Sequence, residues 1–146
     1  MAAGVSMPEE HVELFRQRLN ELCTLTEEEL TEVIHIDMAL PFSYVSERLV
    51  EELSLLEPFG KGNTRPLFAE KNLKVYYPQI VGKNQNVLKF QVQDSTGNRM
   101  DAVYFGEARK CLEYIQRKQE MAFTFYPSVN EYNGRRTIQL TVVNYQ

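Results

Sequence analysis

The chain changes character at Leu55-Leu56-Glu57-Pro58-Phe59-Gly60-Lys61-Gly62-Asn63-Thr64-Arg65-Pro66-Leu67-Phe68, where an amphipathic helical pattern gives way to alternating strand patterns. Pro58 cannot continue a helix, because its ring blocks the preceding turn and it has no N–H to donate. Gly60 and Gly62 permit backbone angles that other residues avoid. The stretch therefore predicts a rigid corner that fixes how the parts on either side are oriented, with its two phenylalanines as apolar anchors.

Charge divides at the same place. Residues 1–57 carry three basic and thirteen acidic side chains, a formal charge of −10, whereas residues 58–146 carry thirteen basic and seven acidic ones, a formal charge of +6. The whole chain, at −4, would not suggest a nucleic-acid partner. The basic excess favours such a partner for the second part only. An acidic first part is most simply a solvated helical surface.

Composition indicates a globular protein of a reducing compartment. A length of 146 residues suits one domain, or a small domain with an appendage. No apolar run approaches the roughly 20 residues of a membrane helix, and the N-terminus has no signal-peptide pattern. Cys23 and Cys111 lie far apart in predicted helices, so we interpret both as buried thiols rather than a disulfide. We expect a cytoplasmic protein with no membrane partner.

The part before the corner is predicted to be α-rich. Ser6 and Glu9 predict a capping box that starts a helix over residues 8–23. Its apolar stripe is Val12, Phe15, Leu19 and Leu22. Thr26 and Glu29 predict a second capped turn.

A short strand and another helix are predicted to follow. Residues 32–37 alternate polar and apolar side chains, the period of a strand. Ser43 is the expected cap of the next helix. The buried face of that helix is predicted to be Val45, Leu49, Leu53 and Leu56. The apolar stripes of this part need a partner surface, and we expect some of it to be missing or supplied by a second copy.

The part after the corner has strand patterns interrupted by one helix. A long first strand ends near Val81, and Pro78 predicts a bend or bulge within it. On this strand Leu73, Val75 and Tyr77 are predicted to share one face, with Lys74 and Tyr76 on the other. Later strands are predicted over residues 88–93, 100–105, 121–126 and 137–144, and a helix begins after Gly106.

This order of elements predicts a fold class. Three strands, one helix and two strands, in about 80 residues, form the sequence of an OB-fold, a small five-stranded Greek-key barrel. Closing the barrel hides the edges that an open sheet would expose. We therefore predict a mainly β protein with some α-helix: an OB-fold barrel with one helix between strands three and four, preceded by an α-rich N-terminal segment.

The corner also carries a resemblance to a known family. Pro-Phe-Gly-x-Gly-Asn followed by Pro-x-Phe resembles the junction of the RecJ family, single-strand-specific DNA exonucleases of the DHH phosphoesterase superfamily. In that family the junction joins the DHH-associated domain to a C-terminal OB-fold. The family pattern has proline and then an acidic residue after the asparagine, where this chain has Thr64 and Arg65.

The resemblance extends to both sides of the corner. The second part resembles the RecJ OB-fold throughout, and Ala2-Ala3-Gly4 is similar to the end of a Gly-Gly-His-x-x-Ala-Ala-Gly motif of the DHH-associated domain. The resemblance thus implies domains of 1–57, the end of the DHH-associated domain with a connecting helix, and 58–146, the OB-fold. It also implies that the chain is a C-terminal fragment, either an excised piece or a truncated reading frame.

The catalytic residues of the superfamily have no counterpart in this sequence. Two-metal hydrolysis of a phosphodiester needs several Asp and His ligands that converge, and this chain has only two histidines, with no Asp-His-His and no Asp-x-Asp. We predict no catalytic residue, metal site or cofactor in this chain. The resemblance implies that Mn²⁺ or Mg²⁺ serves a catalytic core that is missing here.

Basic and aromatic side chains on the predicted barrel favour single-stranded nucleic acid. OB-folds use basic side chains for the backbone and aromatic rings for base stacking. The candidate contacts are Lys74, Tyr76, Lys83, Lys89, Gln91, Arg99, Tyr126, Tyr132, Arg135 and Arg136. Each of them taken singly is about as readily explained as a solvated surface residue, whereas the set favours nucleic acid.

Two functions remain open at this point. In the first, the chain is the single-stranded-DNA-binding part of a RecJ-like enzyme, which the resemblance implies to be a 5′-to-3′ exonuclease of DNA repair and recombination. In the alternative, the OB-fold is a protein-interaction or bracing module without nucleic-acid contact. The expected partners are single-stranded DNA, the missing N-terminal DHH catalytic core and other DNA-repair proteins.

Overall fold

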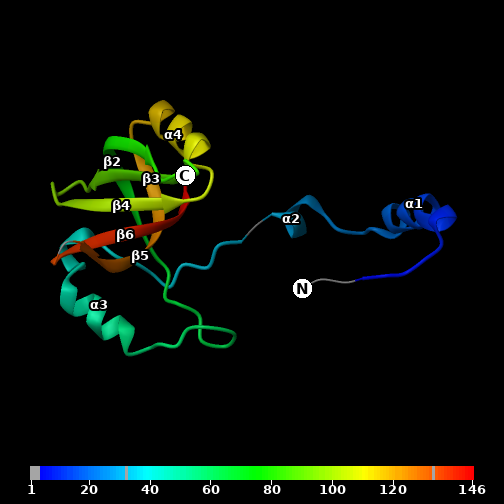
Figure 1. Ribbon diagram of the computed structural model, residues 1–146, viewed down its shortest axis with the longest axis horizontal. Helices are drawn as coiled ribbons and strands as arrows, with labels where there is room; N and C mark the ends of the chain where they lie inside the picture. Colours follow the sequence, from blue (N-terminus) through cyan, green and yellow to red (C-terminus); the bar gives the residue numbers. More distant parts are fainter. Residues whose placement is uncertain (1–3, 32, 133) are drawn as a thin grey trace. The chain divides into compact units, whose positions relative to one another are not determined.

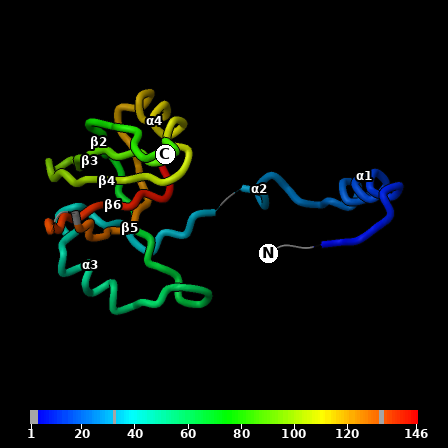
Figure 2. Tube along the Cα trace, in the orientation of Figure 1, coloured from blue at the N-terminus to red at the C-terminus, as the bar shows by residue number. Residues whose placement is uncertain are grey.

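The computed structural model describes residues 4–31, 33–132 and 134–146, with the side chain of Tyr132 outside the description. It contains two compact units, Met1–Ile34 and His35–Gln146, which are shown as a ribbon in Figure 1 and as a Cα trace in Figure 2. The corner lies inside the second unit. The domain boundary after residue 57, which concerns the parent protein, stays a prediction.

The first unit consists of short helices without a core. Its elements are the 3₁₀ helix η1 (Glu9–His11) and the α-helices α1 (Val12–Leu22) and α2 (Glu27–Leu30). None of the described side chains of these helices is buried. Phe15 and Leu19 of α1 are 38% and 54% exposed. Within the described part of this unit, nothing buries the apolar stripe of α1.

Two predictions for this unit are corrected and one is confirmed. The capping box at Ser6 is wrong, because η1 follows Pro8 without a side-chain cap. Cys23 is exposed rather than buried, since it caps a helix that has no buried residue. The capped turn at Thr26 is confirmed: its hydroxyl accepts from the Glu29 N–H at 3.3 Å, and the Glu29 carboxylate accepts from the Thr26 N–H at 2.9 Å.

The second unit is built around a closed β-barrel with one helix at an end of the barrel. Its main elements are β2 (Phe68–Val81), β3 (Val87–Gln93), β4 (Arg99–Phe105), α4 (Ala108–Arg117), β5 (Met121–Tyr132) and β6 (Arg135–Tyr145). The strands pair in the order β2-β3-β4-β6-β5, and β5 pairs back with β2 to close the barrel (Figure 1). Only the β4–β6 pairing within this ring is parallel. The predicted five-stranded Greek-key OB-fold is confirmed.

The barrel interior is built from alternate positions of each strand. Leu88, Phe90 and Val92 of β3 are at most 4% exposed, so the period-two pattern places them inside. Cys111 and Ile115 of α4 are buried against the same core, as the helical spacing predicted. Burial of each large apolar side chain contributes about 1.5–3 kcal/mol. Burial also raises the pKa of the Cys111 thiol to about 12.

A bulge interrupts β2 at the predicted place. The β2–β3 register passes from Tyr76 opposite Gln91 to Gln79 opposite Lys89, so Tyr77 and Pro78 together oppose one residue. Tyr77 has a φ of 52°. The prediction that Tyr77 lies on the apolar face is wrong: the bulge turns its side chain outward, and it is 69% exposed.

The strand predicted over residues 32–37 is also wrong. Described residues 33–36 form no strand, and β1 (Met38–Ala39) follows them instead, pairing in parallel with Phe68 and Ala69 at the start of β2. The Asp37 carboxylate accepts from the Leu67 N–H at 2.8 Å. The alternating pattern of residues 32–37 therefore ends just before Met38, the first residue that pairs with β2.

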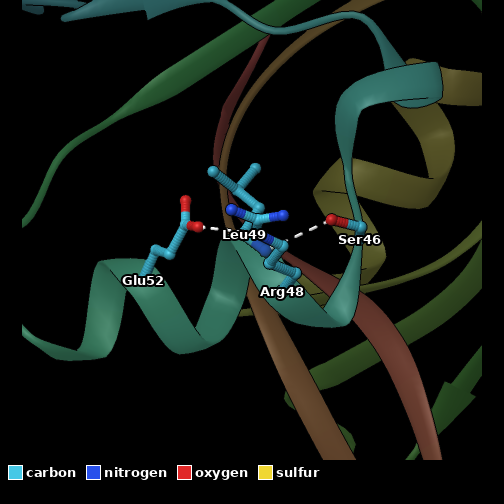
Figure 3. A network of polar contacts seen from close by, with 4 residues as sticks. All are labelled: Ser46, Arg48, Leu49 and Glu52. Atoms are coloured by element: carbon cyan, nitrogen blue, oxygen red, sulfur yellow. Dashed lines mark hydrogen bonds and ion pairs between the residues drawn. The ribbon is translucent and has the colours of Figure 1, made fainter.

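Helix α3 (Glu47–Ser54) begins later than predicted. Its cap is Ser46, whose hydroxyl accepts from the Leu49 N–H at 3.2 Å (Figure 3), whereas Ser43 lies in a separate 3₁₀ helix, η2 (Phe42–Tyr44). Leu49 and Leu53 pack against the barrel core, so their expected missing partner is the barrel itself. The two other residues predicted for the buried face of this helix lie outside it. Val45 is buried but precedes the helix, and Leu56 is exposed beyond its end.

The corner between α3 and β2 forms a hydrogen-bonded turn. Gly60 and Asn63 exchange backbone hydrogen bonds of 2.9 and 3.1 Å, and the Asn63 side chain donates to the Leu56 and Pro58 carbonyls. Phe68 is buried in the core. The Arg65 guanidinium lies 4.7 Å from the Tyr126 ring centroid, which attaches the corner to β5.

Candidate nucleic-acid interface

The outer face of β2, β3 and β4 carries five of the ten candidate contacts, namely Lys74, Tyr76, Lys89, Gln91 and Arg99. Tyr76 pairs with Gln91 across β2 and β3, and Lys74 pairs with Gln93. On the next ladder Gln91 faces Asp101 and Gln93 faces Arg99. Because side chains at paired positions share a face, these strands place amide, basic and aromatic groups side by side.

Arg99 is held over this face by an aromatic ring. Its guanidinium carbon lies 4.9 Å from the centroid of the Tyr76 ring. A cation over a ring at an exposed site is worth about 0.5–1 kcal/mol. The contact positions the guanidinium while its N–H groups can still donate to a phosphate.

A first hollow lies where this face meets the β5–β6 hairpin and α3. It has a volume of about 460 Å³, and its lining includes Gln91, Arg99 and Arg136 together with Glu47 of α3. An Arg136 nitrogen also lies 3.9 Å from a Glu51 oxygen, in an exposed ion pair. Exposed pairs of this kind contribute about 0–1 kcal/mol, so a phosphate can compete with Glu51 for Arg136.

A second hollow lies further along the same face. It has a volume of about 250 Å³ and is lined in part by Tyr77, Gln79, Lys89, Gln91 and Asp101. The Gln91 amide donates to an Asp101 carboxylate oxygen at 3.0 Å. Gln91 and Asp101 line both hollows, so this hydrogen-bonded pair connects them.

The structure places the remaining candidates elsewhere. Tyr126 lies on β5 beneath Arg65 and lines neither hollow. Lys74 lines a separate hollow with Lys118 of α4. Lys83 is exposed in the turn between β2 and β3, and Arg135 is exposed at the start of β6.

Two predictions fall at the tip of the β5–β6 hairpin. The Tyr132 side chain, a candidate contact, and Asn133 of the Asn133-Gly134 pair, whose sequence predicts a tight turn, lie outside the described residues. The two strands continue to Tyr132 and Arg135, so most of the connection predicted between residues 127 and 136 is strand. Pro127 lies in β5 opposite Leu140. Because proline is uncommon within strands, the sequence predicts a shorter hairpin than the structure has.

Sequence reasoning missed three side chains that line the two hollows. They are Glu47, Tyr77 and Asp101. The alternation of β4 already placed Asp101 outward, so a search for outward acidic residues would have found it. Tyr77 could be found only once the bulge was known, and Glu47 only once the packing of α3 was known.

The β3–β4 turn supports the strands that carry this face. The Asp94 carboxylate accepts from the backbone N–H groups of Thr96 and Asn98 at 2.9 Å and from both of their side chains. Partial burial raises the Asp94 pKa, but these hydrogen bonds outweigh that effect and hold the pKa below its ordinary value. The turn is thus pinned by a charged acceptor.

Neither a cluster of metal ligands nor a membrane-spanning helix is found among the described residues. Among residues 4–31, 33–132 and 134–146, no three His, Cys, Asp or Glu side chains lie close enough together to hold a metal ion. In the same described part of the chain, no helix is long and apolar enough to cross a membrane.

Comparison with known proteins gives a family match. The family described as the RecJ OB domain matches residues 36–144. Among curated relatives, the single-stranded-DNA-specific exonuclease RecJ of Bacillus subtilis is 28% identical over 144 residues, and RecJ of Haemophilus influenzae is 29% identical over 145. The alignments cover 97% of this chain but only 18% and 25% of those two proteins.

A solved structure shows the same fold. The crystal structure of RecJ from Thermus thermophilus in complex with Mn²⁺ matches with a TM-score of 0.69 at 19% identity. The match covers 97% of this chain and 20% of that one. This likeness supports the fold, and the relatives' lengths show that the chain spans about a fifth to a quarter of them.

Proposed function

The chain belongs to the RecJ family through its OB domain, and on that premise we propose that residues 35–146 bind single-stranded DNA across the outer face of β2, β3 and β4. The observation that carries the proposal is the pair of connected hollows on this face, lined by Lys89, Arg99 and Arg136. Basic side chains that follow a groove neutralise the phosphates of a single strand.

Aromatic side chains give the face its preference for unpaired bases. Tyr76 lies beneath Arg99, and Tyr77 is exposed beside the second hollow. Every base has a π-face, so stacking on such rings contributes about 1–3 kcal/mol per base without reading the sequence. In a duplex the base faces are stacked on one another, so these rings favour a single strand.

A charge-reversal experiment tests the proposal. The chain is titrated against a fluorescein-labelled single strand of twelve thymidines, and anisotropy reports the affinity. We expect Kd near the micromolar range at low salt, and a loss of more than about tenfold in the double variant Lys89→Glu, Arg136→Glu, because two phosphate contacts become repulsive.

A matched double variant serves as the control. Lys110→Glu with Arg117→Glu changes the net charge by the same amount, but both residues lie on α4. It should weaken binding less than about threefold, through the long-range field alone. Equal losses in the two double variants, or no binding by the unmodified chain, would overturn the proposed face.

For the parent protein we extend the proposal to a division of labour. A catalytic core outside these residues would cleave single-stranded DNA from the 5′ end, in repair and recombination, and would hold the Mn²⁺ or Mg²⁺. The names of the relatives support the exonuclease, and the Mn²⁺ complex of the Thermus protein supports a metal-dependent core. The OB domain would hold the strand that this core shortens.

One observation favours a bracing function, although it concerns the first unit and not the OB-fold to which the alternative assigns bracing. The apolar side chains of α1, such as Leu19 and Leu22, are more than half exposed. They suit contact with the catalytic core or another repair protein. If the twelve-nucleotide strand fails to bind while the chain binds a separately expressed core, the bracing function replaces strand binding.

A further inference from the structure

The second hollow combines groups that suit one nucleotide. An exposed aromatic ring (Tyr77), a lysine (Lys89) and a hydrogen-bonded amide and carboxylate (Gln91 and Asp101) line the same space of about 250 Å³. We infer that this hollow is a base-reading subsite that prefers guanine and disfavours thymine. The inference rests on the proposed binding of single-stranded DNA and deepens it.

Tyr77 supplies the stacking surface. A tyrosine with a φ of 52° is a rare backbone state, and strain of this kind concentrates at functional sites. The Tyr77 side chain at the bulge is not buried, since it is 69% exposed. The centroid of its ring lies 6.3 Å from that of the Tyr76 ring. The strained backbone thus presents an aromatic face to the hollow instead of to the core.

The carboxylate of Asp101 is not expected in a groove that binds phosphates alone. A carboxylate repels a polyanion, and here it sits between Lys89 on one side and Arg99 and Arg136 on the other, lining both hollows. Within the protein it accepts a hydrogen bond from the Gln91 amide, and an ionised carboxylate has about four acceptor positions. Its remaining capacity suits hydrogen-bond donors on the edge of a base.

The acceptor chemistry of Asp101 distinguishes the bases. Guanine presents two adjacent donors, N1–H and the N2 amino group, that a carboxylate accepts together. Thymine presents one N–H between two carbonyl oxygens, and these oxygens are repelled by the carboxylate. Cytosine and adenine present an amino group beside an acceptor and should fall between them. Gln91, held by Asp101, offers its carbonyl oxygen and its second N–H to the same base edge.

Lys89 completes the subsite from the side of the backbone. It is exposed on β3 opposite Gln79 and lines the same hollow. An ammonium group on a flexible stem contacts phosphate as a point charge. With the base stacked on Tyr77 and its edge against Asp101, the adjoining phosphate would be held by Lys89.

The test compares two single strands of twelve nucleotides, all thymine and alternating thymine–guanine. The alternating strand has no run of guanines that could form quadruplexes, and it offers guanine in half of its registers. We expect the 146-residue chain to bind it about five times more tightly, near the lower end of the value of a bidentate base contact. An alternating thymine–cytosine strand should be intermediate.

Variants of Asp101 and Tyr77 separate the two contacts. Asp101→Asn should bind the all-thymine strand more tightly and reduce the preference for guanine to less than about twofold, because an amide donates as well as accepts. Glu113→Gln on α4, which removes the same charge outside the hollow, should leave the preference unchanged. Tyr77→Ala should weaken both strands about five- to tenfold, and Tyr77→Phe should retain binding.

The possible outcomes are distinguishable. If neither the all-thymine nor the thymine–guanine strand binds, the proposed function and the subsite both fail. If both strands bind with equal affinity, or if Asp101→Asn keeps the preference for guanine, the subsite is overturned and the proposed function stands. Binding that Tyr77→Ala leaves unchanged likewise overturns the stacking role, provided that thermal melting shows the variant to be folded.

Discussion

Tyr77 has a backbone conformation that costs free energy and an aromatic ring that lies largely in water. A left-handed backbone costs a non-glycine residue about 1–2 kcal/mol, and the ring is mostly exposed, so its burial recovers little of this. The combination is explained if the ring serves a ligand. We therefore predict that function and stability conflict at Tyr77.

Replacing Tyr77 by glycine tests that conflict. We expect Tyr77→Gly to raise the free energy of unfolding by about 0.5–1 kcal/mol, because glycine adopts a positive φ without a Cβ clash, while affinity for single strands falls. Urea denaturation measures the first effect. Gln79→Gly, in the same strand, should lower stability by about 0.5–1 kcal/mol. A less stable Tyr77→Gly would show that the ring is a packing element.

Arg65 covers part of two neighbouring aromatic rings. Its guanidinium lies over the rings of both Phe59 and Tyr126. Tyr126 is a candidate base contact by sequence, but the structure occupies one face of its ring with Arg65. The pairing could not be predicted from spacing, because it joins a turn to a strand that lies far along the sequence.

At the scale of elements, helix α3 depends on its cap. The Ser46 hydroxyl satisfies the Leu49 N–H, and Arg48 pairs with Glu52 one turn later at 2.8 Å (Figure 3). We expect Ser46→Ala to lower the free energy of unfolding by about 1 kcal/mol. Ser43→Ala, at the position that spacing alone suggested, should change it by less than about 0.5 kcal/mol. Chemical denaturation of the two variants distinguishes the caps, and the reverse ranking would contradict the structure.

The β3–β4 turn makes a pH-dependent contribution. Because hydrogen bonds hold the Asp94 pKa below its ordinary value, the folded state favours the carboxylate. This stabilisation is present at neutral pH and is lost as pH falls through the lowered pKa. We expect Asp94→Ala to cost about 1–2 kcal/mol at pH 7 and to flatten the fall of the melting temperature in acid. Ser95→Ala, in the same turn, should leave the wild-type profile intact; an unchanged Asp94→Ala profile would refute the role.

Regular elements were predictable wherever one face is buried. In β3 the alternating residues Leu88, Phe90 and Val92 are buried on one face. In α4 the helical spacing of Cys111 and Ile115 likewise places both on the buried face. The short strand β1 was not predictable, because its two residues become strand only by pairing with β2. The hollows were not predictable either, since they depend on the bulge in β2 and on the packing of α3.

At the scale of the whole molecule, the second unit is almost neutral. Residues 35–146 carry fourteen basic and twelve acidic side chains, a formal charge of +2, because the segment around α3 is acidic. The proposed binding therefore depends on where the basic side chains lie, not on a strong overall field. If Lys89, Arg99 and Arg136 each neutralise one phosphate, affinity should fall about 15- to 20-fold between 50 and 200 mM salt.

Mapping by NMR shows whether the outer face of β2, β3 and β4 holds a single strand. Amide resonances of the ¹⁵N-labelled chain are followed while the twelve-thymidine strand is added. We predict that the largest shifts fall on Tyr77, Lys89, Gln91, Arg99 and Asp101, and that they shrink as salt rises. Shifts confined to α1 and α2, or to the side of β5 beneath Arg65, would contradict this prediction.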